Sequence, residues 1–297
     1  MVARDAPRMI GTATMRLKCL WPDTMRQTLA VDRPERAAAF VAGSGEGPQL
    51  RGAPLLSLLS DAGQCRALAA TLTSVSLTMT GGGQVVAALG LPDRRPAPLV
   101  VLIHEWWGLT DQIKAMAVFL AEAGYVTLAV DLLDGRVASS VDEAASLSAK
   151  VHGAAARETL ARWIHWGRAL EQCSGRVGVL GWCFGGGLAL MASLATPVDA
   201  TVIYCGLVMG KAPALKALKG PVMGHFGLAD EFVPWPMIAG FTAEMQAADR
   251  VFHRYLYDAG HGFANPSGTH HHPVAATLAW RRTEAFLAET LWSGGMT

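Results

Sequence analysis

The chain has 297 residues and a formal net charge of +1 at pH 7, from 25 Lys plus Arg and 24 Asp plus Glu. Hydrophobic residues make up 51% of it and charged residues only 16%, which excludes a solvated, disordered chain. The balanced charge, without a long basic run, removes the electrostatic argument for a nucleic-acid partner. These numbers indicate a compact globular protein with a large buried core.

Residues 1–73 show no sustained apolar period, and we assign them no fold. We treat them as an N-terminal extension, and three interpretations stay open: a loosely ordered segment, a small appendage, or the product of an upstream start codon. Charged residues such as Arg4, Arg8 and Lys18 leave no room for the apolar stretch of a signal peptide. We therefore expect a cytoplasmic protein.

From residue 74 onward the pattern becomes regular. Ser74–Thr80 and Val85–Leu91 flank Gly81–Gly83, which predicts an antiparallel hairpin. Further strands are expected at Leu99–Ile103, Tyr125–Val130, Val177–Leu180, Ala200–Tyr204, Val222–Phe226 and Arg254–Tyr257. Helices are expected at Asp111–Ala123, Val141–Leu170, Gly186–Ala195, Trp235–Ala247 and Pro273–Leu291. This alternation predicts an α/β domain over residues 74–297, with a mainly parallel sheet covered by helices on both faces.

One segment is long and uncharged enough to raise the question of a membrane span. Val177–Val198 has no charged residue, and the segment is long enough to cross a bilayer. Gly181, Gly185, Gly186 and Gly187 interrupt this segment, and Arg176 and Asp199 flank it. A buried strand, a tight turn and a buried helix give the same pattern, and we favour that interpretation.

The turn inside this segment carries the candidate nucleophile. Gly181-Trp182-Cys183-Phe184-Gly185 follows a buried strand and precedes a helix, as in the GxSxG nucleophile elbow with cysteine in the serine position. Glycines suit such a turn because side chains there would collide with neighbouring backbone. The sulfur would lie near a helix N-terminus, which favours a thiolate.

Two later strand ends supply the partners that such a nucleophile needs. Asp230 follows the strand Val222–Phe226, and His261 follows Arg254–Tyr257, in the order nucleophile, acid, histidine. His261 would take the thiol proton, and Asp230 would orient the imidazole. The backbone N–H groups of Phe184 and Trp106 are the candidate oxyanion hole.

Five runs together resemble the dienelactone hydrolase family of cysteine-dependent α/β-hydrolases: HEWWG, DLLDGRVAS, GWCFGG, GLADEFVP and AGHGFANP, which begin at residues 104, 131, 181, 227 and 259. The resemblance covers residues 74–292. It implies a triad of Cys183, Asp230 and His261, and opening of cyclic enol esters that bear a carboxylate, in the breakdown of aromatic compounds.

The resemblance also implies roles for residues outside the triad. Glu105 would take part in activating the thiol, Arg136 would bind the substrate carboxylate, and Tyr204 would line the pocket. Asn265 replaces an arginine of well-known members, which weakens the case for dienelactone itself and leaves a broader ester or lactone open. A structural ion pair for Glu105 and plain sheet packing for Tyr204 stay as alternatives.

We expect a monomer that acts on a small lactone or ester, without nucleic acid, membrane, cofactor or metal. His270, His271 and His272 are consecutive and cannot all point at one ion, so a solvated loop is the simpler interpretation. Two other functions stay open. One is a redox-responsive binding protein with Cys183 as a sensor thiol, and the other is a serine-type peptidase or general esterase, which the cysteine disfavours.

Overall fold

The computed structural model describes residues 59–79 and 81–292. Within them, eight strands form one sheet in the order β1-β2-β4-β3-β5-β6-β7-β8. β2 pairs antiparallel with β1 and β4, and the other neighbours are parallel. This confirms the expected sheet and its N-terminal hairpin. The strands are β1 (Thr73–Thr78), β2 (Gln84–Gly90), β3 (Ala97–Ile103), β4 (Val126–Val130), β5 (Cys173–Trp182), β6 (Ala200–Tyr204), β7 (Val222–Gly227) and β8 (Phe252–Tyr257).

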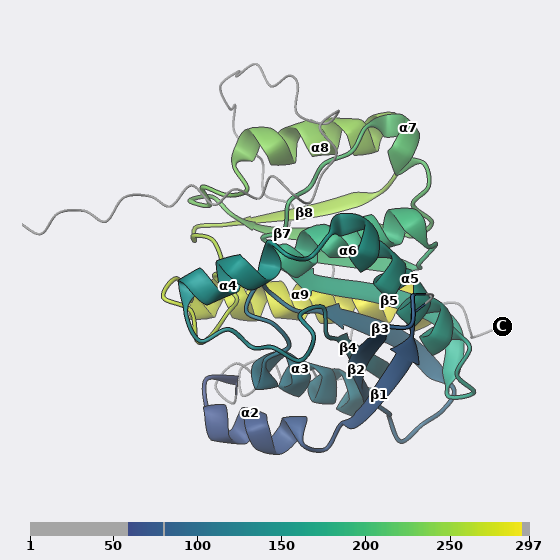
Figure 1. Cartoon of the computed structure of the whole chain (residues 1–297). Helices are drawn as coiled ribbons and strands as arrows, with labels where there is room; N and C mark the ends of the chain where they lie inside the picture. The colour runs from purple at the N-terminus through teal and green to yellow at the C-terminus, as the bar shows by residue number, and fades with distance from the viewer. Residues whose placement is uncertain (1–58, 80, 293–297) are drawn as a thin grey trace, which may run out of the picture.

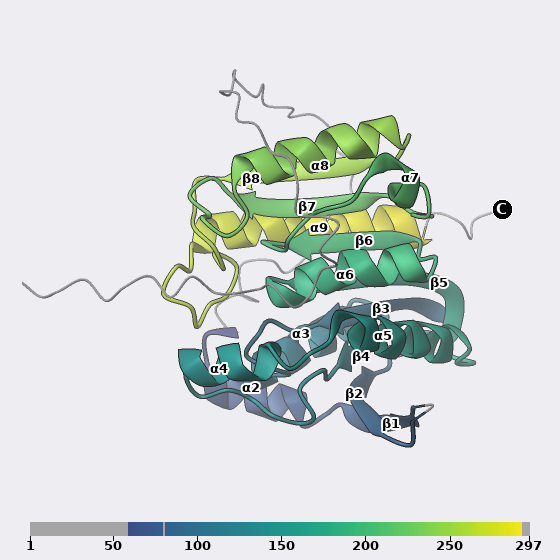
Figure 2. The ribbon, with the colours of Figure 1, turned by 45° about the horizontal axis from the view of Figure 1, so that its top comes forward.

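Helices cover both faces of the sheet (Figures 1 and 2). Their bounds are α2 (Ala62–Ala69), α3 (Asp111–Glu122), α4 (Val141–Ser148), α5 (Gly153–Arg168), α6 (Phe184–Ala195), α7 (Ala212–Leu215), α8 (Trp235–Ala247) and α9 (Pro273–Trp292). Every residue of β3 is buried, and its side chains alternate between the faces. Val100 and Leu102 pack with α3 and α9, whereas Leu99 and Val101 pack with α5 and α6.

The single helix expected over Val141–Leu170 is wrong, because the structure has two helices there. α4 ends at Ser148 and α5 begins at Gly153, after His152 in an extended conformation. The two helices also bury different surfaces: α4 packs against the loop around Leu133, and α5 packs against the sheet. Helical spacing continues across the break, so the apolar pattern alone does not reveal it.

The N-terminal extension falls only partly within the described residues. Residues 1–58 lie outside them, so the interpretations offered for that part stay predictions. Leu59 and α2 are described, and α2 lies beside α3 at one edge of the molecule (Figure 1). The chain therefore has ordered structure before the domain start expected at residue 74.

The uncharged segment 177–198 is a strand and a helix, as favoured from its glycines. It forms most of β5 and all of α6, and Cys183 is the single residue between them. Among the helices in the described part of the chain, none is both long and apolar enough to span a membrane.

Candidate active site

Cys183 occupies a strained turn at the carboxyl end of β5. Its backbone has φ 50° and ψ −112°, a conformation that side-chain-bearing residues seldom adopt. The backbone N–H of Cys183 donates to the carbonyl of Tyr204 on β6 at 2.7 Å. A Cβ at Gly181 would overlap the carbonyl of Gly185, and one at Gly185 would overlap the carbonyl of Ile103. Glycines on both sides therefore make the turn possible.

The imidazole of His261 lies between the thiol and a carboxylate. Its Nε2 is 3.0 Å from the Sγ of Cys183, and its Nδ1 is 2.8 Å from Oδ2 of Asp230. The other oxygen of Asp230 accepts the backbone N–H groups of Phe232 and Val233, at 2.8 and 3.0 Å. Asp230 is thus held in place by its own loop. The loops after β5, β7 and β8 bring the three predicted residues within hydrogen-bonding distance.

The surroundings make His261 a strong proton acceptor. Burial lowers the pKa of His261, but the contacts with Asp230 and Cys183 outweigh it and raise the pKa to about 10. The side chain keeps 19% of its surface exposed, so a reacting molecule has access from one side. The arrangement can take a proton from Sγ and hold it as an imidazolium stabilised by the carboxylate.

The candidate oxyanion hole lies where α6 begins and the loop after β3 passes. Phe184 is the first residue of α6, where backbone N–H groups lack a partner within the helix. The loop of Trp106 is held by buried His104. Nε2 of His104 accepts a hydrogen bond from the backbone N–H of Leu132 at 3.1 Å. The proton of the His104 ring is therefore on Nδ1, which donates to the carbonyl of Glu105 at 2.5 Å. The sequence offered no signal for this role of His104.

Glu105 contacts Asn265, the residue four positions after His261. Its Oε2 accepts a hydrogen bond from Nδ2 of Asn265 at 2.6 Å. Burial raises the pKa of Glu105 to about 7, although this hydrogen bond and the positive charge of His261 both lower it. The alternative of a structural ion pair does not describe this contact, because the partner is a neutral amide. Glu105 can therefore change its charge near neutral pH.

Arg136 lies on a loop that packs against the Glu105 loop. Asp131 orders this loop by accepting the backbone N–H groups of Leu133 and Gly135. A Cβ at Gly108 would overlap the carbonyl of Arg136, so the two loops touch. The Arg136 side chain is 56% exposed, and its Nη2 lies 3.3 Å from Glu143. It is a solvent-accessible cation on a loop that adjoins the Glu105 loop.

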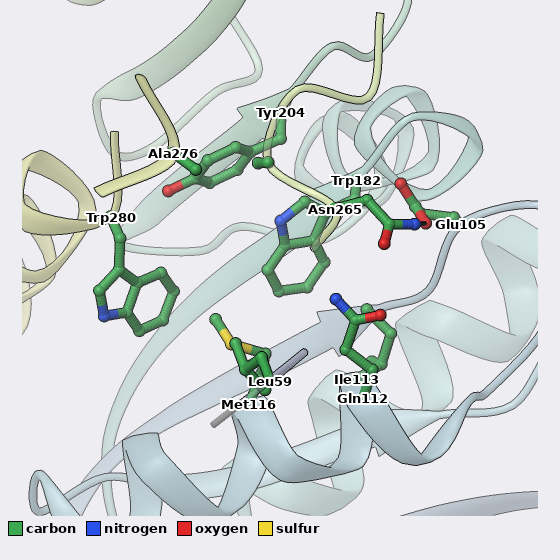
Figure 3. Close-up of a pocket in the computed structure, with 11 residues that line it drawn as sticks. Leu59, Glu105, Gln112, Ile113, Met116, Trp182, Tyr204, Asn265, Ala276 and Trp280 are labelled. Atoms are coloured by element: carbon green, nitrogen blue, oxygen red, sulfur yellow. Dashed lines mark hydrogen bonds between the residues drawn. The ribbon is translucent and has the colours of Figure 1, made fainter. Parts of the chain in front are cut away.

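Tyr204 lines a pocket beside the site, but its hydroxyl is not free to bind a ligand. The pocket is bordered by Glu105, Trp182 and Asn265 (Figure 3). The Tyr204 hydroxyl is 2.7 Å from Oγ1 of Thr283 on α9, in the core. Its ring stacks on Trp182, with 5.7 Å between the centroids. Tyr204 thus offers the pocket an aromatic face.

One group of side chains in the described part of the chain has the spacing of a metal site. Cys205, Asp230 and His261 each place a potential ligand atom within 4.8 Å of the others. Both oxygens of Asp230 already accept hydrogen bonds, and both nitrogens of His261 have partners. Burial also raises the pKa of the Cys205 thiol, which disfavours the thiolate that a metal requires. The contacts suit proton transfer better than metal binding.

Comparisons with known proteins agree with this architecture. The model of the dienelactone hydrolase family matches residues 85–291. Carboxymethylenebutenolidase 1 of Cupriavidus pinatubonensis is 31% identical over 224 residues, which cover 72% of this chain and 95% of that protein. Carboxymethylenebutenolidase of Pseudomonas putida is 29% identical, with the same coverage.

A crystal structure of a putative dienelactone hydrolase from Klebsiella pneumoniae superposes with a TM-score of 0.66 at 20% identity, covering 74% of this chain and 99% of that one. The mainly parallel sheet, with a tight turn after β5, has the α/β-hydrolase fold. The chain belongs to the dienelactone hydrolase family, and it is a hydrolase.

Proposed function

We propose that this hydrolase opens small lactones or carboxylic esters through an acyl-cysteine intermediate on Cys183. The observation that carries the proposal is the position of the His261 imidazole, 3.0 Å from Sγ and 2.8 Å from the Asp230 carboxylate. The curated relatives named carboxymethylenebutenolidase support a lactone as the substrate class.

The reaction has two halves. In the first, Nε2 of His261 takes the thiol proton, Sγ attacks the carbonyl carbon, and the C–O bond breaks as His261 returns the proton to the leaving oxygen. In the second, His261 takes a proton from water, whose oxygen attacks the thioester carbon. The C–S bond then breaks as His261 returns the proton to Sγ, which releases a carboxylic acid and restores the thiol. Asp230 stabilises the imidazolium in both halves.

The negative charge that forms on the carbonyl oxygen needs donors already in place. The backbone N–H of Phe184, at the start of α6, is one donor, and the N–H of Trp106 is the other. The helix dipole of α6 adds positive potential at the same point. When it is ionised, Glu105 assists electrostatically, because its negative charge favours the imidazolium that His261 forms on taking the thiol proton.

Arg136 is the candidate cation for a carboxylate on the substrate. Its planar guanidinium can exchange the single contact with Glu143, at 3.3 Å, for a bidentate contact with that carboxylate. Asn265 offers a neutral amide where the resemblance leads one to expect a second arginine. Neutral esters and lactones are therefore also within reach of this site.

The substitution Cys183→Ala tests the proposal. We expect kcat/KM for lactones and p-nitrophenyl esters to fall by at least about 10⁴-fold, because the covalent route is lost. Cys173→Ala, at the far end of β5, is the matched control and should retain activity. Turnover by folded Cys183→Ala protein would contradict the proposal. Peroxide-dependent ligand binding by a parent protein without hydrolysis would favour a sensor instead.

A further inference from the structure

The segment that precedes the family match reaches the pocket that Glu105 also lines. The family model begins at residue 85, whereas α2 spans Ala62–Ala69. Asp61 caps α2 by accepting the N–H groups of Gly63 and Gln64, at 2.8 and 3.0 Å. Cys65 is buried against α3, and its Sγ contacts the carbonyl of Leu59 at 3.5 Å. These contacts hold Leu59 in a defined place.

Leu59 forms one wall of the pocket beside the active site. Its side chain is only 3% exposed and packs in the same cluster as Ile113 and Met116 of α3. Figure 3 shows Leu59 beside Met116, on the side of the pocket away from Glu105 and Asn265. The pocket is thus bounded by Glu105 and Asn265 at one end and by Leu59 at the other.

The space between these ends is small. The cavity volume is about 30 Å³, which is room for a water molecule and not for a long acyl chain. Among the remaining walls, Trp182 on β5 and Trp280 on α9 lie in the same buried cluster as Leu59. Loss of the three outer carbons of Leu59 would lengthen the cavity directly.

We propose that Leu59 is a specificity-determining residue, which closes the apolar end of the pocket and limits the length of the group that extends from the reacting carbonyl. This inference rests on the proposed ester and lactone hydrolysis at Cys183. It gives the segment before the family domain a function in substrate selection, and the substrate class becomes esters or lactones with a short apolar substituent.

The experiment compares long and short probes in two reactions. The first is hydrolysis of p-nitrophenyl acetate and p-nitrophenyl octanoate. The second is disulfide formation at Cys183 with methyl and octyl methanethiosulfonate, followed by mass spectrometry of the Cys183 peptide, which needs a reactive thiol but no hydrolysis. Leu59→Ala, Leu59→Phe and the control Leu68→Ala, on α2 but outside this pocket, are each checked by thermal unfolding.

For Leu59→Ala we expect the long-to-short rate ratio to rise by about tenfold or more in both reactions. Leu59→Phe should lower the ratio, and Leu68→Ala should leave it unchanged. Unchanged ratios in both folded Leu59 variants would overturn the inference while leaving the proposed hydrolysis intact. If the parent hydrolyses no ester but the thiol reaction shows the shifts, the proposed function fails and the pocket wall stands.

Discussion

Burial and the hydrogen bond from Asn265 act in opposite directions on the charge of Glu105 near neutral pH. Burial disfavours the charged form of a carboxyl group, and this is the largest cause of the rise in the pKa of Glu105 to about 7. The hydrogen bond from Asn265 and the positive charge of His261 oppose the rise. The residue is therefore neutral at acidic pH and ionised at alkaline pH.

We predict that kcat/KM rises as pH increases through about 7, the pKa of Glu105, because the ionised carboxylate assists removal of the thiol proton. Asn265→Ala removes a hydrogen bond that stabilises the carboxylate, so the midpoint of the rise in kcat/KM should move to higher pH. Asn265→Arg adds a positive charge and should move it to lower pH. Glu105→Gln should abolish the rise of kcat/KM near pH 7, because the amide does not titrate. Identical midpoints in both Asn265 variants would contradict the assignment.

Arg136 is expected to separate charged from neutral substrates. In Arg136→Ala we predict that kcat/KM falls about 10- to 100-fold for carboxylated esters, since a charge-assisted bidentate contact is lost. Neutral esters should react as before. Arg136→Lys keeps the charge without the planar fork and should recover only part of the loss. Equal losses for both substrate types would show that Arg136 does not bind the carboxylate.

At the scale of elements, the joint between β5 and α6 is the part of the fold that function constrains most. Cys183 has a positive φ, and the glycines beside it let the backbone of α6 lie against the ends of β3 and β6. Such strain persists only where the surroundings enforce it.

Two glycines of α6 give a matched pair that tests this joint. A Cβ at Gly185 would overlap the carbonyls of Ile103 and His104, whereas one at Gly187 has neighbours at 3.6 Å or beyond. We predict that Gly185→Ala lowers the free energy of unfolding by about 3 kcal/mol and removes activity. Gly187→Ala should stabilise the protein by up to about 1 kcal/mol. Urea denaturation measures both, and equal stabilities would contradict a constrained elbow.

Sequence patterns predicted these elements well where strands are short, apolar and bounded by glycine or proline. They failed at Val141–Leu170, because the pattern reports which residues are apolar but not which surface they face. The break before Gly153 exists because α4 and α5 pack on different partners, and tertiary packing of that kind is not encoded in local spacing.

At the scale of the whole molecule, one sheet brings residues distant in the sequence to a single edge. The position of Cys183, Asp230 and His261 at this edge could be predicted, because parallel strands end together. Asn265 bonds to Glu105 across 160 residues, and Leu59 reaches the pocket from outside the family domain. Neither contact could be predicted, since both depend on how loops and a helix pack at the edge.

The central claim is that Cys183 carries the acyl group, and trapping that intermediate tests it most directly. The protein is mixed with an activated ester of a slowly deacylating acid, quenched in acid during turnover, and digested for peptide mass spectrometry. We predict an added acyl mass on the peptide that contains Cys183, absent from the Cys183→Ala variant. Turnover without an adduct, or an adduct confined to another residue, would contradict the account.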